Sequence, residues 1–182
     1  TRPQYHKEMD KHRHPIVEEN GMQAKVYLKS GKDHAVNNRH PWIFSGAISR
    51  AEGVEDGGTV EILSASGEWL ARGYYNSRSQ MTVRIWTWDK SETIDAAFFE
   101  RRVQQALALR RQLGLGAGGK DGAATTAFRL LNAESDLLPG VVADVYSDCV
   151  VLQIGTLGAE RRKASLVTAI QAALKPLSIY ER

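Results

Sequence analysis

The sequence predicts an α+β protein in which a helix joins a small β-barrel to a mixed α/β domain. Short apolar segments with turn residues between them fill residues 22–88. One long helical pattern follows, and strand patterns then surround a second helical pattern. The chain has 182 residues, of which 42% are hydrophobic, and this is enough for two small cores.

Residues 1–21 are expected to form no core. They hold two prolines, few apolar residues and three of the five histidines, namely His6, His12 and His14. Because no fixed element or second ligand cluster supports these histidines, we predict no metal site. We interpret the segment as a disordered tail or as an addition to the natural sequence.

Residues 22–90 are expected to form the barrel. Turn residues such as Gly57-Gly58 separate its strands, and one helical turn is expected at 32–38. In the last strand Val83 and Ile85 share one face and Arg84 and Trp86 share the other, so that only one face is expected in the core. The predicted strands are 24–28, 43–48, 59–63, 69–75 and 82–88.

A linker is expected at 91–124, made of a helix and a Gly/Ala-rich loop. Asp95 suits the N-cap of this helix, and Gly114 follows its last residue, Leu113. Four arginines are spread around the helix by its rotation of about 100° per residue, and we interpret them as solvating and linking residues. They are Arg101, Arg102, Arg110 and Arg111.

Residues 125–182 are expected to form the second domain. A helix is predicted at 160–174 and is stopped by Pro176. A further strand begins at Ile179, three residues before the end of the sequence, so we expect this domain to be incomplete. The other predicted strands are 128–131, 141–146 and 149–154, the last two joined by a turn at Ser147-Asp148.

We predict no catalytic residue in this chain. The loop from Gly114 to Lys120 resembles a phosphate-binding loop, but it follows a helix instead of a strand, and Asp121 replaces the Ser or Thr that would bind magnesium. Cys149 lies in an apolar strand, where an inert thiol is expected. The single cysteine and the lack of a long apolar run predict a cytoplasmic protein without a membrane partner.

Charge and aromatic residues predict RNA binding by the barrel. Residues 22–50 contain five Lys or Arg and one acid, whereas residues 52–68 contain five acids and no base. Cations near aromatic and short polar side chains are typical of surfaces that bind RNA phosphates and stack bases. Trp42 and Phe44 also fit core positions, which we favour for both rings. The candidate RNA-binding residues are Lys29, Lys32, Arg39, His40, Arg72, Arg78 and Gln80.

The segments Arg39-His-Pro-Trp-Ile-Phe-Ser-Gly and Trp69-Leu-Ala-Arg-Gly-Tyr-Tyr-Asn resemble the PUA domain of RlmI-type large-subunit ribosomal RNA methyltransferases. Phe128-Arg-Leu-Leu-Asn-Ala-Glu-Ser-Asp is similar to the central, EEHEE-like α/β domain of that family. Leu137 departs from the family, which usually has Gly there, and this puts the usual backbone shape of the turn in doubt. The Glu134-Ser-Asp motif itself is interpreted as turn capping.

The resemblance implies that the parent protein uses S-adenosylmethionine to methylate C5 of a cytosine in large-subunit ribosomal RNA. It also implies that the catalytic domain lies outside these 182 residues. They would then bind RNA without binding the cofactor or catalysing. Two alternatives remain, a stand-alone RNA-binding adaptor and a nucleotide-binding enzyme that uses Gly114 to Lys120. The sequence leaves a homodimer open.

Overall fold

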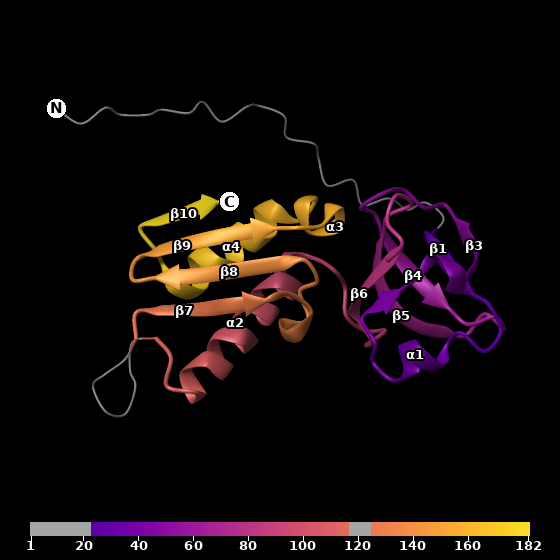
Figure 1. Cartoon of the computed structure of the whole chain (residues 1–182), viewed down its shortest axis with the longest axis horizontal. Helices are drawn as coiled ribbons and strands as arrows, with labels where there is room; N and C mark the ends of the chain where they lie inside the picture. The colour runs from indigo at the N-terminus through magenta and orange to yellow at the C-terminus, as the bar shows by residue number, and fades with distance from the viewer. Residues whose placement is uncertain (1–22, 117–124) are drawn as a thin grey trace.

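The structure is a computed structural model that describes residues 23–116 and 125–182. Two β-sheet units stand side by side along the long axis of the molecule (Figure 1). The three histidines of the N-terminal segment, and Lys120 and Asp121 of the glycine-rich loop, lie outside the described residues. No described helix is long and apolar enough to cross a membrane.

The first unit is a curled six-stranded sheet around its own apolar core. The strands lie in the order β2-β6-β5-β4-β1-β3, and all pairs are antiparallel except β1 with β4. Buried side chains such as Val26, Ile62 and Ile85 fill the inside of the curl. The strands are β1 (Lys25–Leu28), β2 (Trp42–Ile43), β3 (Ile48–Glu52), β4 (Thr59–Leu63), β5 (Trp69–Tyr75) and β6 (Val83–Thr87).

Four of the five predicted strands of this unit are confirmed, as β1, β4, β5 and β6, and the predicted helical turn is α1 (His34–Asn37). The strand predicted at 43–48 is wrong. Only Trp42 and Ile43 pair with β6; the chain then forms the 3-10 turn η1 (Ser45–Ala47) and enters β3. The polar β3 had escaped prediction because residues 49–52 are all exposed at the sheet edge, so no apolar alternation marks them.

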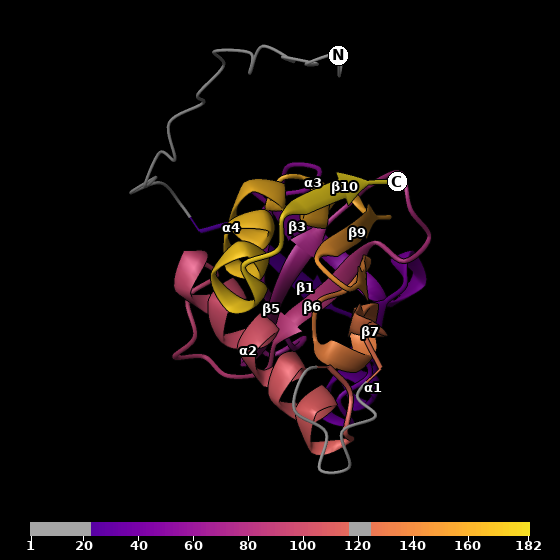
Figure 2. The same ribbon diagram turned by 90° about the vertical axis from the view of Figure 1, so that its left-hand side faces the viewer.

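The second unit is a four-stranded sheet with helices on one face. Its strands lie in the order β10-β9-β8-β7, and β10 runs parallel to β9. Helices α2 and α4 pack against each other on the same side of this sheet (Figure 2). The strands are β7 (Ala127–Asn132), β8 (Val141–Tyr146), β9 (Cys149–Ile154) and β10 (Ser178–Glu181), and the helices are α2 (Ala96–Gln112), α3 (Leu157–Glu160) and α4 (Lys163–Leu174).

The predicted strands of this unit and the linker helix are confirmed. Asp95 caps α2, because its Oδ1 accepts a hydrogen bond from the backbone N–H of Phe98 at 2.8 Å. The single helix predicted at 160–174 is wrong, since the chain forms α3 and α4 with a break at Arg161 and Arg162. A 3-10 turn that the sequence had not indicated, η2 (Ala133–Asp136), follows β7.

The two units share a core. Tyr74 of β5 and Trp86 of β6 are 2% and 1% exposed, and both belong to the apolar cluster of the second unit. The Trp86 ring lies 5.6 Å from that of Phe99 in α2, at an edge-to-face angle of 88°. The expectation that only one face of the last barrel strand is buried is therefore wrong, because the second unit covers the other face.

Candidate RNA-binding surface

Three segments of the first unit meet at η1. The backbone N–H of Lys29 donates to the Ala47 carbonyl at 2.9 Å, and its Nζ donates to the Gly46 carbonyl, also at 2.9 Å. From the other side, the Ser45 N–H donates to the Gln80 carbonyl at 2.9 Å. A Cβ added at Gly46 would meet no atom within 4 Å, so the surface above η1 is open.

Phe44 lies at the start of this open area, and its side chain is 47% exposed. The core position favoured for this ring is therefore wrong, whereas Trp42, two residues earlier, is half-buried. An exposed aromatic ring beside cations is suited to stack an unpaired base. We call the exposed residues around η1 the η1 surface; they are Lys29, Lys32, Phe44, Arg78 and Gln80.

The cations of the η1 surface have no ion-pair partner within the part of the chain that the structure describes. Among the described residues, no carboxylate forms an ion pair with Lys29, Lys32 or Arg78. Lys32 is held close to Lys29 by a backbone hydrogen bond of 3.0 Å. The local turn of Arg78 is fixed by Asn76, whose Oδ1 accepts from the Arg78 N–H at 3.0 Å.

Arg39 and His40 form a second exposed pair, between α1 and β2. The Arg39 guanidinium lies 5.4 Å from the centroid of the Trp88 ring. The His40 ring meets Trp42 edge to face at 5.7 Å, and its Nδ1 accepts from the Trp42 N–H at 3.2 Å. Strand β2 connects this pair to the η1 surface, because it runs from Trp42 to the residue before Phe44.

Arg72 does not join the other predicted residues. Its Nε donates to Glu61 at 2.5 Å, its Nη1 donates to the Glu92 carbonyl, and only 14% of its side chain is exposed. Glu61 also accepts from the indole N–H of Trp69. Arg72 therefore ties the barrel to the segment before α2. The sequence could not separate it from the other arginines, because Glu61 and Glu92 become its neighbours only in the fold.

Glu134 joins the two units. Its Oε1 accepts from Trp42 Nε1 at 2.8 Å and from Arg84 Nη1 at 2.9 Å. Asp136 receives both Nη atoms of Arg110 at 2.5 and 2.7 Å. The Glu134-Ser-Asp motif thus holds the barrel with one carboxylate and α2 with the other, while Asp136 also caps the Asn132 N–H at 2.6 Å, as expected of a turn motif.

Leu137, where the family usually has Gly, keeps a backbone conformation that favours Gly. Its φ is +57°, in the left-handed region. Its backbone N–H donates to the Glu134 carbonyl at 3.1 Å. The turn that carries Glu134 and Asp136 is therefore left-handed at this position in spite of the side chain.

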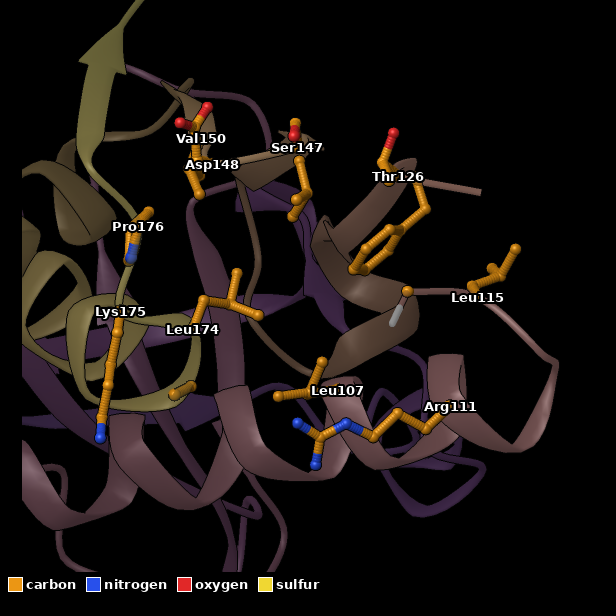
Figure 3. A pocket seen from close by; sticks show the side chains of 14 residues that line it. Leu107, Arg111, Leu115, Thr126, Ser147, Asp148, Val150, Leu174, Lys175 and Pro176 are labelled. Carbon is orange, nitrogen blue, oxygen red and sulfur yellow. The ribbon is translucent and has the colours of Figure 1, made fainter. Parts of the chain in front are cut away.

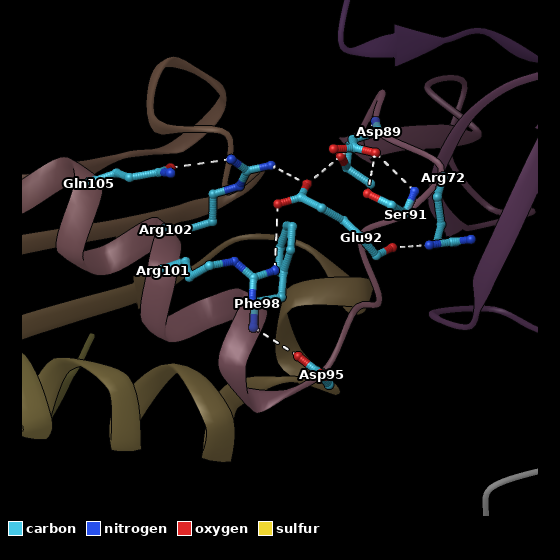
Figure 4. Close-up of polar contacts among 10 residues, drawn as sticks. Arg72, Asp89, Ser91, Glu92, Asp95, Phe98, Arg101, Arg102 and Gln105 are labelled. Atoms are coloured by element: carbon cyan, nitrogen blue, oxygen red, sulfur yellow. Dashed lines mark hydrogen bonds and ion pairs between the residues drawn. The ribbon is translucent and has the colours of Figure 1, made fainter.

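Only two of the four arginines of α2 are exposed to solvent. Arg102 and Arg110 are buried, so their predicted solvation is wrong, whereas Arg101 and Arg111 are exposed. Arg102 donates to Glu92 at 2.8 Å and lies over the Phe98 ring (Figure 4). Burial lowers the pKa of its guanidinium, and its Nε is buried without a hydrogen-bond partner. This cluster holds α2 against the barrel.

One cavity of about 450 Å³ lies at the far end of the second unit, between α2, α4 and the sheet (Figure 3). Leu107, Phe128 and Leu174 form part of its apolar wall, and Arg111 and Lys175 also line it. None of the predicted RNA-binding residues lines it. Within 23–116 and 125–182, no group of three or more His, Cys, Asp or Glu side chains could hold a metal ion.

Comparison with known proteins gives the family context of this fold. Residues 26–88 match the family model described as a PUA-like domain. The chain is 47% identical over 162 residues to ribosomal RNA large subunit methyltransferase I of Aliivibrio fischeri (strain ATCC 700601 / ES114). It is 43% identical to the proteins of the same name from Shigella flexneri and Escherichia coli (strain K12). Each match covers 88% of this chain and 39% of the relative.

Solved structures have the same fold. A putative SAM-dependent methyltransferase from Streptococcus mutans superposes with a TM-score of 0.73 at 19% identity, over 88% of this chain and 40% of that one. A putative methyltransferase complexed with SAH gives the same values. The chain thus spans about two fifths of the length of the proteins that it matches. Residues 26–88 thus match a PUA-like domain, and the chain is similar to a segment of ribosomal RNA large subunit methyltransferase I.

Proposed function

We propose that this chain is the RNA-binding part of an S-adenosylmethionine-dependent enzyme that methylates C5 of a cytosine in large-subunit ribosomal RNA. The observation that carries the RNA-binding part is the η1 surface, where the segments of three cations without a described ion-pair partner meet next to an exposed phenylalanine in the sequence. The similarity to ribosomal RNA large subunit methyltransferase I supports methyl transfer and large-subunit ribosomal RNA as the substrate. It also favours an enzyme over a stand-alone adaptor.

Each residue of the surface has a physical role in this proposal. Lys29, Lys32 and Arg78 bind phosphate oxygens, and Phe44 stacks on a base. The Gln80 side chain is exposed beside η1 and supplies an amide donor and acceptor. The pair Arg39 and His40 extends the contact along β2. Arg72 is left out, because Glu61 and Glu92 already occupy its guanidinium.

The glycines of the second unit whose Cβ positions are filled by neighbouring side chains give no support for an S-adenosylmethionine site among the described residues. Gly155, which follows β9, and Gly158 of α3 could leave room for a cofactor, but a Cβ at Gly158 would lie 2.2 Å from the Tyr74 ring. The space beside Gly140 is likewise filled by Thr156, 2.4 Å from a Cβ there. We therefore place the cofactor and the methyl-transfer step outside the described residues. The homodimer is not part of the proposal, because the comparisons give no support for it.

The salt dependence of RNA binding tests whether the cations of the surface bind RNA phosphates. With contacts from Lys29, Lys32, Arg39 and Arg78, the logarithm of the association constant should fall against the logarithm of salt concentration with a slope of about −3 for single-stranded RNA. Lys29→Gln and Arg78→Gln should each reduce this slope by about 0.7. Fluorescence anisotropy of a labelled single-stranded RNA of mixed sequence measures it.

The matched control is Arg111→Gln, which removes an exposed arginine at the far end of the second unit and should leave the slope unchanged. Salt-independent binding, or no binding at low salt, would contradict the proposal. Incubation with labelled S-adenosylmethionine and ribosomal RNA should transfer no methyl group with the 182 residues alone. Transfer would show that catalysis lies within them.

A further inference from the structure

The break between α3 and α4 places two arginines of the second unit against the first. Arg161 forms an ion pair with Glu55, and a Cβ added at Gly57 would lie 2.6 Å from its Nε. Arg162 donates from Nη2 to Thr59 Oγ1 at 3.0 Å. The Arg161 guanidinium therefore lies at the loop between β3 and β4, which we call the seam loop (residues 53–58), and that of Arg162 lies at Thr59, the first residue of β4.

The seam loop also touches the segment that carries Arg78. Asp56 accepts from the Ser77 N–H at 2.6 Å and from the Ser77 hydroxyl at 3.0 Å. The Gly57 N–H donates to the Tyr75 carbonyl at 2.7 Å. Hydrogen bonds from Ser77, together with the charges of Arg78 and Arg161, lower the pKa of the Asp56 carboxyl. Arg78 and Arg161 thus lie near the same carboxylate, one from each unit.

Hydrogen bonds between neighbouring segments connect these positions to η1. Lys29 binds the Gly46 carbonyl, Ser45 binds the Gln80 carbonyl, and the loop of Gln80 holds Ser77 beside the seam loop. The cations along this route are Lys32, Lys29, Arg78, Arg161 and Arg162.

The arginines at the seam are not fully neutralised. Glu55 is the partner of Arg161, and the Asp56 carboxylate is bound by Ser77. Among the described residues no carboxylate forms an ion pair with Arg162, which is half-buried. Burial and the neighbouring charge of Arg161 lower the pKa of the Arg162 guanidinium. Glu55 and Asp56 offset part of the charge of these two adjacent cations, and Arg162, which has no described ion-pair partner, is the one that favours the approach of an anion.

We propose that the RNA-binding surface crosses from the barrel to the second unit, where Arg161 and Arg162 bind the backbone phosphates of the same RNA strand. The proposal rests on RNA binding by the η1 surface. A polyanion with evenly repeated charges fits a row of cations that continues from one unit to the other better than a short acidic segment does. The second unit would then help to set the path of the strand in addition to supporting the barrel.

The test compares RNA binding by two variants of the 182-residue chain, one in which Arg161 loses its positive charge and one in which it keeps it. Arg161→Gln should reduce the salt slope for a labelled single-stranded RNA of mixed sequence by about 0.7, one phosphate contact. Arg161→Lys should keep the slope, because the positive charge remains. Arg162→Lys should also keep it, and Arg111→Gln is the matched control that should leave it unchanged. Urea unfolding of each variant shows whether the fold is retained.

The outcomes separate this proposal from RNA binding by the barrel alone. If Lys29→Gln reduces the slope and Arg161→Gln does not, the extension onto the second unit is overturned and the η1 surface stands. If the unchanged chain binds no RNA at low salt, both are overturned. If polyglutamate binds more tightly than the RNA and loses this binding in Arg161→Gln, the seam belongs to an acidic protein partner, and the extension is again overturned.

Discussion

Gly158 of α3 lies directly against the ring of Tyr74 in β5. A Cβ at this position would be 2.2 Å from two ring atoms, where real Cβ contacts do not occur. The ring has no free space to move into, because it is 2% exposed, lies 4.9 Å from the Trp86 ring and donates its hydroxyl to Thr156 at 2.9 Å. Burial also raises the pKa of the Tyr74 phenol, so that it stays a hydrogen-bond donor.

Gly158→Ala should therefore lower the free energy of unfolding by about 1–3 kcal/mol, the usual cost of forcing a methyl group into a packed core. Gly46→Ala is the control, since nothing lies within 4 Å of its Cβ, and it should change stability by less than about 0.5 kcal/mol. Urea denaturation of both variants measures the difference. Equal stability of Gly158→Ala and the unchanged chain would refute the close approach.

The sequence could predict single residues where a local pattern decides them. Asp95 as an N-cap and the turn at Ser147-Asp148 depend on neighbours in the chain, and both are confirmed. Two other outcomes depend on segments that are distant in the sequence. These are the exposure of Phe44 and the hydrogen bond from Arg72 to Glu61, which leaves Arg72 unavailable for RNA. The sequence alone does not show whether the fold buries an aromatic ring or pairs a cationic side chain with an acid.

At the scale of the elements, the N-cap of α2 can be tested by substitution of Asp95. Asp95 accepts the Phe98 N–H and so satisfies one of the unpaired donors at the start of this 17-residue helix. Asp95→Ala should lower the free energy of unfolding by about 1 kcal/mol, whereas Asp95→Asn, which keeps an acceptor oxygen, should lower it by less. Circular dichroism during urea titration follows the helix.

Asp33→Ala is the matched control for this prediction. Asp33 stands at the N-cap of α1, but its side chain makes no cap hydrogen bond. Its replacement should therefore change the free energy of unfolding by less than about 0.5 kcal/mol. A loss at Asp33 as large as at Asp95 would mean that the effect of Asp95 comes from its charge and not from the cap.

Elements were predictable from sequence where an apolar face marked them. Strands β4 and β5 were predicted at their observed bounds because each alternates or concentrates buried side chains. The failures are η1, β3, η2 and the break between α3 and α4. Strand β3 is exposed along most of its length, and the break carries contacts of Arg161 with Glu55 and of Arg162 with Thr59, which no local pattern reveals.

At the scale of the whole molecule, a shared core and side-chain hydrogen bonds bind the units into one body. Tyr74 and Trp86 extend from the first unit into the core of the second, and Glu134 bonds back to Trp42 and Arg84. A barrel without the second unit would expose these two large rings to water, at a cost of about 1.5–3 kcal/mol for each buried aromatic side chain. The orientation of the η1 surface relative to the second unit is therefore fixed by packing.

Shared packing predicts that the two units unfold together. All four tryptophans, Trp42, Trp69, Trp86 and Trp88, belong to the first unit, whereas the long helices α2 and α4 belong to the second. Tryptophan fluorescence and far-UV circular dichroism should consequently give the same urea midpoint. Ile62→Ala creates a cavity in the core of the first unit alone. It should lower both midpoints equally and should reduce the free energy of unfolding by about 2–5 kcal/mol. A fall in the fluorescence midpoint without a matching fall in helicity would show that the units unfold independently, and that the shared aromatic cluster does not couple them.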